Sequence, residues 1–206
     1  TKAPMPAPRC ALAAGVIDGL IYVAGGIDLV GLTGGVRFVG TLEVYDPKTN
    51  TWITKAPMPT ARYSMAAGVV DGILYVAGGF GSSGYQQVLE AYDPETDSWT
   101  TKPPMPTPRE ASVAGVVNGI LYVAGGINAS GAPQTVEAYN PETNTWVEKA
   151  PIPMARYAPA GGVIDGIFYI VGGSGRNEVQ AYDPKTNTWI ADTPMPTGRT
   201  GSAAGV

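Results

Sequence analysis

Hydrophobic residues occur along the chain in short runs separated by residues that favour turns. Residues 66–70 (Ala-Ala-Gly-Val-Val) are followed by Asp71-Gly72 and then by a second run, residues 73–77, which ends at a glycine pair. Asp-Gly and Asn-Gly favour type I′ turns, because both central residues of that turn take a positive φ. Short runs rich in Val, Ile and Tyr are typical of β-strands. The pattern therefore predicts a hairpin of two strands, A and B.

Two further segments complete the unit. Strand C is predicted at sequences such as residues 136–139 (Val-Glu-Ala-Tyr), and a turn such as Asp46-Pro47 follows it, with the residue types that a type I turn prefers. Strand D begins near a tryptophan. It stops at a proline-rich segment such as residues 56–59, because proline cannot donate to a strand ladder. The unit is predicted to contain four antiparallel strands.

This unit recurs four times, and self-similarity at a fixed period is the signature of repeat architectures. Its marks are a tryptophan (Trp52, Trp99, Trp146, Trp189), a glycine pair beginning at Gly25, Gly78, Gly125 and Gly172, and a tyrosine before Asp-Pro or Asn-Pro (Tyr45, Tyr92, Tyr139, Tyr182). An arginine recurs at Arg9, Arg62, Arg109, Arg156 and Arg199. We predict a single domain with units at residues 10–57, 63–104, 110–151 and 157–194, and partial units at 1–9 and 195–206.

An apolar run ending in Gly-Gly, a later tyrosine and a tryptophan after it resemble the Kelch repeat, and the four copies cover essentially the whole chain. The resemblance implies an all-β fold, a β-propeller with one four-stranded antiparallel blade per repeat. It also implies that strand A lines a central channel and that strand D forms the outer edge. Without it, the pattern predicts only a short-stranded propeller or sandwich. We expect the glycine pairs to let the tryptophan approach the backbone closely.

The two ends of the chain overlap in sequence. Residues 3–16 align with residues 193–206, and 8 of the 14 positions are identical. The resemblance implies six or seven blades, so three interpretations compete. The chain is part of a longer propeller, or it associates with another chain through its unpaired strand, or it forms a compact four-bladed ring with a redundant end.

Composition narrows the chemistry that the chain can perform. Histidine is absent and Cys10 is the single cysteine, which excludes Ser-His-Asp and Cys-His catalysis, an intrachain disulfide and thiolate zinc sites. We expect Cys10 to be a buried small residue. The formal net charge of −4 disfavours nucleic-acid binding. No apolar run reaches the length of a membrane span, and we recognise no secretory signal. We expect a soluble protein without metal or cofactor, and no compartment is predicted.

All length variation between the repeats lies in one connection. The second glycine and the tyrosine are separated by 19, 13, 13 and 9 positions, so each insertion falls between strands B and C. Loops that accept insertions are exposed and concentrate binding residues. The B–C and D–A loops emerge on one face of the predicted propeller, and we place the binding surface there.

The candidate binding residues follow the Gly-Gly and Pro-x-Arg elements, where the resemblance implies that ligands meet Kelch propellers. They are Asp28, Arg37, Phe38, Tyr63, Ser64, Phe80, Tyr85, Glu110, Asn128, Tyr157, Arg176 and Asn177. Tyr and Arg are frequent anchors of protein interfaces. The recurring arginines have two interpretations: a basic ring around the channel mouth, or structural pairs with strand C carboxylates such as Glu43, Glu90 and Glu137. We favour the structural pairs.

Three functions remain open. The leading hypothesis is a non-catalytic propeller that binds a protein or a polymer, because the loops vary and no catalytic constellation is present. The first alternative is a structural or self-assembling repeat protein, natural or engineered. The second is a sugar-active enzyme similar to the Kelch-like mutarotases, for which few acid or base groups are available. The sequence does not name a ligand.

Overall fold

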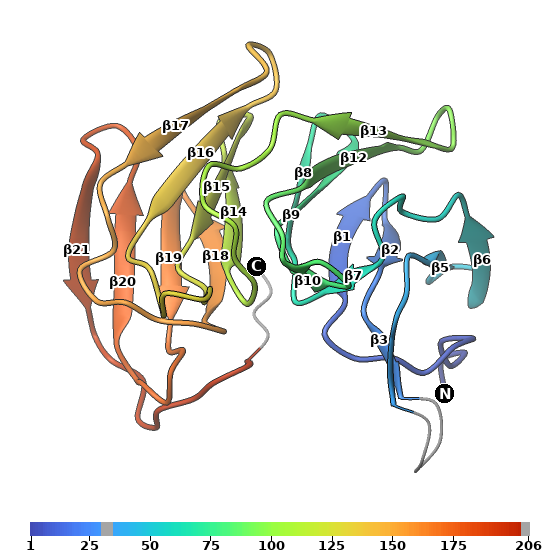
Figure 1. Ribbon diagram of the computed structural model, residues 1–206, viewed down its shortest axis with the longest axis horizontal. Coiled ribbons are helices and arrows are strands. Elements are labelled where there is room, and N and C mark those ends of the chain that lie inside the picture. Colours follow the sequence, from blue (N-terminus) through green and yellow to red (C-terminus); the bar gives the residue numbers. More distant parts are fainter. Residues whose placement is uncertain (30–34, 203–206) are drawn as a thin grey trace.

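The computed structural model describes residues 1–29 and 35–202, in which every regular element is a β-strand (Figure 1). Four antiparallel sheets each contain four strands in the order A-B-C-D. They are blade 1, β1 (Ala13–Ile17), β2 (Leu20–Ala24), β5 (Leu42–Asp46) and β6 (Thr51–Lys55); blade 2, β8 (Ala66–Val70), β9 (Ile73–Ala77), β12 (Leu89–Asp93) and β13 (Ser98–Lys102); blade 3, β14 (Val113–Val117), β15 (Ile120–Ala124), β16 (Val136–Asn140) and β17 (Thr145–Lys149); and blade 4, β18 (Ala160–Ile164), β19 (Ile167–Val171), β20 (Val179–Asp183) and β21 (Thr188–Asp192). The predicted all-β fold of four-stranded blades is confirmed.

Two small sheets decorate the ends of the blades. One pairs β3 (Ile27–Leu29) with β4 (Val36–Phe38), and the other has the order β11 (Gly84–Tyr85), β10 (Phe80–Gly81), β7 (Arg62–Tyr63). Both include strands of a B–C connection, where the sequence predicts the insertions. The insertions therefore extend the blades with short hairpins.

The turns between strands A and B have the backbone conformation that the sequence predicts. In blade 2, Asp71 and Gly72 have φ of 48° and 77°, and the corresponding pairs of the other blades also have positive φ. Each C–D turn contains one left-handed residue, Asn50, Asp97, Asn144 or Asn187. Its Oδ1 accepts a hydrogen bond from the strand C tyrosine hydroxyl of the same blade at 2.6–2.8 Å. The turn is thus tied to the blade core.

The tryptophans join neighbouring blades. Trp99 Nε1 donates to the carbonyl of Ala56 at 2.8 Å, and the Ala56 amide donates to Asp97 Oδ1 at 3.0 Å. Ala56 directly follows strand D of blade 1. Equivalent indole bonds reach Ala3, Pro103 and Ala150 from the other three tryptophans. The tryptophan of each blade therefore binds the chain segment that leads into that blade.

The glycine pairs serve a different purpose from the predicted one. A Cβ on Gly78 would lie 2.6 Å from the carbonyl oxygen of Arg109, and a Cβ on Gly125 would lie 2.6 Å from that of Arg156. The group that approaches is the backbone of the next D–A segment, not the tryptophan. Both glycines also have positive φ. Glycine is required because a side chain would collide with this backbone.

The core lies between blades, along the inner strands. β1 packs on β8, β8 on β14, and β14 on β18. A Cβ on Gly15 would lie 2.7 Å from Leu74 Cδ1, so the small residues of strand A let the blades converge. Tyrosine pairs extend the contact outward, for example Tyr75 and Tyr139, whose ring centroids are 5.8 Å apart. The inner placement of strand A agrees with the prediction.

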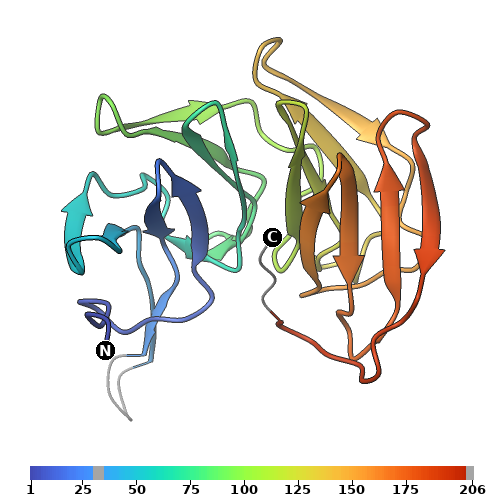
Figure 2. The ribbon, with the colours of Figure 1, turned by 180° about the vertical axis from the view of Figure 1, so that it is seen from behind.

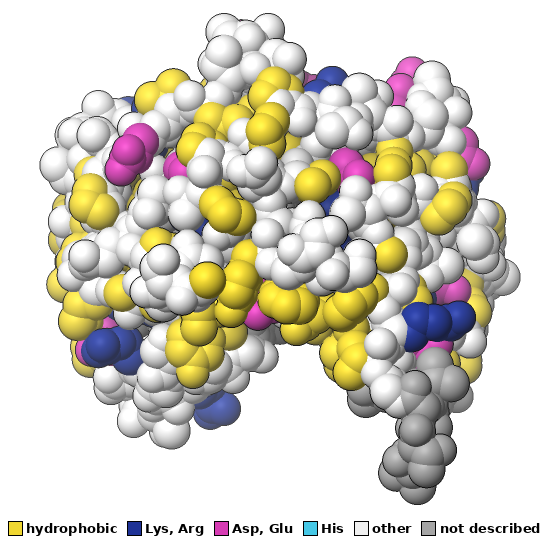
Figure 3. Space-filling model, in the orientation of Figure 1, with side chains coloured by type: hydrophobic (Ala, Val, Ile, Leu, Met, Phe, Trp, Pro, Cys, Tyr) yellow, Lys and Arg dark blue, Asp and Glu magenta, His cyan; other side chains and the backbone are white. Residues whose placement is uncertain are grey.

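The blades form an arc, with the D strands at its periphery (Figures 1 and 2). The inner strands of blades 1 and 4 do not pack on each other as neighbouring inner strands do. Ile164 of blade 4 is 50 % exposed, whereas its counterparts Ile17, Val70 and Val117 are 3–5 % exposed. In Figure 3 the lower margin of the molecule is recessed at its centre. Over the residues described, the compact four-bladed ring is therefore not formed.

Candidate functional site

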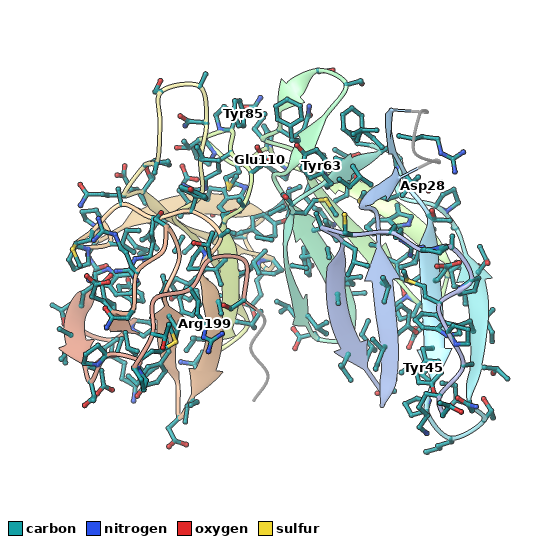
Figure 4. All side chains as sticks on the ribbon, turned by 90° about the horizontal axis from the view of Figure 1, so that it is seen from below. Asp28, Tyr45, Tyr63, Tyr85, Glu110 and Arg199 are labelled. Carbon is teal, nitrogen blue, oxygen red and sulfur yellow. The ribbon has the colours of Figure 1, made fainter. Side chains whose placement is uncertain are left out.

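In blades 1 to 3 the B–C and D–A loops meet in backbone pairs on one face. Tyr63 pairs with Phe80, and isolated bridges join Cys10 to Ile27 and Glu110 to Ile127. In Figure 4, Tyr63, Tyr85 and Glu110 lie close together at one edge, and Tyr45, which bonds a C–D turn, lies at the opposite edge. We call the first edge the loop face and the second the turn face.

A belt of backbone hydrogen bonds joins the D–A segments across this face. The amide of Ser64 donates to Ala11 O (2.8 Å), that of Ala111 to Ser64 O (2.9 Å), that of Ala158 to Ala111 O (2.7 Å) and that of Gly201 to Ala158 O (2.9 Å). All five residues have positive φ, between 48° and 68°. The belt could not be predicted from the sequence, because only Gly201 is a residue type that signals this backbone conformation.

Four aromatic side chains from two blades form a continuous cluster, which we call the aromatic patch: Phe38, Tyr63, Phe80 and Tyr85. The Phe38 and Tyr63 rings stack, with centroids 5.7 Å apart and planes at 13°. Phe80 contacts Tyr63 at 5.8 Å and meets Tyr85 edge-on at 5.1 Å. All four side chains are half-buried. In Figure 3 hydrophobic side chains gather at the lower centre, with acidic atoms among them.

Glu110 of blade 3 lies beside this patch. Burial raises the pKa of its carboxyl above the ordinary value, and the nearby Tyr63 side chain partly offsets that rise. Burial likewise raises the pKa of the Tyr63 phenol, and the charge of Glu110 adds to the effect. A half-buried carboxylate and aromatic rings therefore share one surface.

The other candidate residues do not contribute rings to the aromatic patch, and several serve the loops themselves. Arg37 Nη2 pairs with Asp28 Oδ2 at 2.6 Å across the β3–β4 hairpin. Asn128 Oδ1 accepts the Ser130 amide in a tight turn, and Asn177 Nδ2 donates to the Met195 carbonyl. These contacts stabilise the loops in which the residues lie.

The remaining three candidates differ in what they offer to a ligand. Ser64 takes part in the belt through its backbone. Arg176 Nη1 lies 3.6 Å from Glu178 Oε1 and is half-buried. Tyr157 is 39 % exposed. Cys10 is also exposed, contrary to our expectation, because it lies in the D–A segment before the inner strand β1 begins at Ala13.

Four of the five recurring arginines form contacts within the blades, so their role is structural. Arg62, Arg109 and Arg156 are fully buried. Arg62 Nη1 lies 2.5 Å from Glu90 Oε2 and Arg109 Nη2 lies 2.8 Å from Glu137 Oε2, and Arg9 pairs with Glu43 in the same way. In blade 4 the partner is neutral, since Arg156 bonds Gln180 Oε1 at 2.8 Å. The basic-ring interpretation is wrong for these residues.

The turn face carries an acidic depression of about 210 Å³ between blades 1 and 2. Asp18, Asp71, Asp93 and Glu95 are among the residues that line it. No group of three potential metal ligands occurs in residues 1–29 and 35–202. No helix in those same ranges is long and apolar enough to cross a membrane.

Comparison with known families agrees with this architecture. The KLHDC2/KLHL20/DRC7 Kelch-repeats domain model matches residues 54–205, and the Kelch motif model matches residues 8–59. The chain belongs to the Kelch-repeat family. The resemblance of the recurring Gly-Gly, tyrosine and tryptophan to this repeat is thereby confirmed.

Individual Kelch proteins are similar over part of the chain. Kelch-like ECH-associated protein 1A of Danio rerio is 40 % identical over 75 residues, which are 36 % of this chain and 12 % of that protein. Kelch repeat and BTB domain-containing protein 12 of Homo sapiens is 37 % identical over 86 residues, 38 % of this chain and 14 % of that protein. The chain thus spans a small part of the length of these relatives.

A solved structure shows the same fold. The structure of YjhT matches 98 % of this chain and 76 % of its own, with a TM-score of 0.85 and 18 % sequence identity. At this identity the match concerns the fold alone. It supports the assignment of a Kelch β-propeller architecture.

Proposed function

We propose that this Kelch-repeat chain is a non-catalytic binding protein that holds a protein partner on its loop face. The aromatic patch carries this proposal. It gathers four aromatic rings from blades 1 and 2, with Glu110 of blade 3 at its side, and leaves them half-buried on a surface. Aromatic anchors of this kind dominate the affinity of protein interfaces.

The patch is not required by the repeat, which favours a role in binding. Where blade 2 has the backbone-paired residues Tyr63 and Phe80, blade 1 has Cys10 and Ile27. The same backbone is therefore built without aromatic side chains. The charged pair of Asp28 and Arg37 adds polar groups to the same face, and interfaces commonly combine an apolar centre with a polar rim.

Similar proteins are named for association. One relative is called ECH-associated, and the names of others combine Kelch repeats with BTB or F-box domains. The alternative of a sugar-active enzyme has less support. Such an enzyme would need convergent acid and base groups, and Glu43, Glu90 and Glu137 are held in buried ion pairs.

Selection of peptides tests this proposal directly. A displayed library of random 12-residue peptides is selected on the purified chain, and enriched peptides are measured by fluorescence anisotropy. We expect the double variant Tyr63→Ala/Tyr85→Ala to bind these peptides about 30-fold or more weakly. The matched control, Ile53→Ala/Val147→Ala, removes exposed apolar residues of the outer strands and should bind normally. Peptides that bind both double variants equally would contradict the loop-face assignment.

A further inference from the structure

Glu110 is half-buried and lacks the positive partner that the buried strand C carboxylates have. Glu43, Glu90 and Glu137 each pair with an arginine of the repeat. Among residues 1–29 and 35–202, no ion pair includes Glu110, which lies close to Tyr63 and Tyr85 in Figure 4. Removing a carboxylate from water without a counter-charge is unfavourable. Its place is therefore not explained by the stability of the blade.

The repeat itself does not require a carboxylate here. The equivalent residues are Cys10, Tyr63, Tyr157 and Thr200, none of which carries a carboxylate. The backbone bridge of Glu110 to Ile127 has the same form as that of Cys10 to Ile27. The carboxylate is consequently a feature of one sector of the face, the sector that holds the aromatic patch.

Rings and carboxylate together have the chemistry of a cation site. The faces of aromatic rings attract cations, and the attraction is stronger where water is partly excluded. Phe80 is tilted 50° from Tyr63 and 89° from Tyr85, so the rings offer faces in several directions. A nearby carboxylate adds a charge-assisted hydrogen bond. An anionic ligand would be repelled, and a purely apolar one would bury the charge unpaired.

We propose that the aromatic patch and Glu110 together receive a basic side chain, arginine in preference to lysine, from the protein partner. A guanidinium fits best because its plane stacks on aromatic rings while its N–H groups reach a carboxylate. The formal charge of −4 also favours the approach of a basic segment. This inference rests on the proposed loop-face function, since it names the partner chemistry at the same surface.

Three matched peptides test it by NMR titration of the full chain. They are acetylated, amidated pentapeptides Gly-Ser-Xaa-Ser-Gly, in which Xaa is arginine, its neutral isostere citrulline, or glutamate. We expect the arginine peptide to shift the ring signals of Tyr63, Phe80 and Tyr85. It should bind about five- to tenfold more tightly than the citrulline peptide. The glutamate peptide should bind more weakly than both.

Variants separate the charge of Glu110 from its shape. Glu110→Gln keeps the size of the side chain and should reduce the affinity of the arginine peptide about fivefold, with the citrulline peptide unaffected. Glu178→Gln, a control in the B–C loop of blade 4, should change neither. Equal affinity for arginine and citrulline, shifts elsewhere, or no shifts at all would overturn the inference.

Its failure can be distinguished from failure of the proposed function. Selected peptides that require Tyr63 and Tyr85 but are insensitive to Glu110→Gln would leave the loop-face function standing. They would overturn the assignment of a basic ligand. Peptides insensitive to all three substitutions would contradict both.

Discussion

The two ends of the blades differ in how strictly they repeat. At the turn face, every blade has a tyrosine hydroxyl bonded to an Asn or Asp of the C–D turn, at 2.6–2.8 Å. At the loop face, the equivalent positions carry Cys10, Tyr63, Glu110 and Tyr157 on the same backbone. The turn face repeats because its side chains hold the structure. On the loop face, backbone hydrogen bonds hold neighbouring segments together. The side chains there can therefore differ between blades.

The largest expected effect concerns the buried arginines of blades 3 and 4, which belong to the repeated framework. Arg109→Met leaves Glu137 buried and unpaired, so the free energy of unfolding should fall by about 3–5 kcal/mol. Arg156→Met leaves the neutral Gln180, so the loss should be smaller, about 1–3 kcal/mol. Urea denaturation measures both. Equal losses would show that the charge of the partner is not what matters.

The second test concerns the loop face. Tyr63→Ala/Tyr85→Ala should weaken the binding of a selected peptide by about 30-fold or more, the effect of losing one interface hot spot. Anisotropy titration measures this affinity, and urea denaturation measures the accompanying loss of stability. Arg156→Met is the converse variant. It should lower stability while the native fraction binds with unchanged affinity, and a reversed outcome would contradict the division between framework and site.

The belt predicts a smaller effect of opposite sign. Ala111 has φ 51°, a conformation that costs an L-residue about 1–2 kcal/mol. Ala111→Gly removes this strain but makes the unfolded chain more flexible, so a net stabilisation of about 0.5–1 kcal/mol is expected. Ala114→Gly in β14 should instead destabilise, because that strand residue has no such strain. Thermal unfolding of both variants decides the matter. Destabilisation by both would disprove strain at Ala111.

The smallest effect depends on pH. Hydrogen bonds from the Ala56 amide and then the Tyr92 hydroxyl lower the pKa of Asp97. A lowered folded pKa contributes stability above the unfolded pKa, and this contribution is lost as pH falls through the folded value. The other three blades have asparagine here, which does not titrate. Asp97→Asn should therefore flatten the acid side of the stability profile, measured between pH 2 and 5. If the dependence of stability on pH were unchanged in this variant, Asp97 would not be the group responsible.

Much of the framework could be predicted from local sequence. Asp71-Gly72 and its counterparts indicate the hairpins, because few residue types accept their backbone angles. The recurring arginines and strand C glutamates were correctly interpreted as structural pairs. The sequence shows the glycine pairs, but it does not show which neighbouring group requires glycine at these positions. That neighbour is the backbone of the next repeat, and its distance depends on how the blades pack.

The sequence by itself determined the repeat, the four strands of each blade, the turns and the region of variable loops. These follow from local backbone preferences and from residue types that recur at fixed spacing. Only the tertiary structure brought Phe38 of blade 1 onto Tyr63 and Phe80 of blade 2, and placed Glu110 of blade 3 beside them. It also exposed Cys10 and formed the belt. The physical reason is that the angle and spacing between blades arise from close packing of their inner strands, which no single repeat specifies.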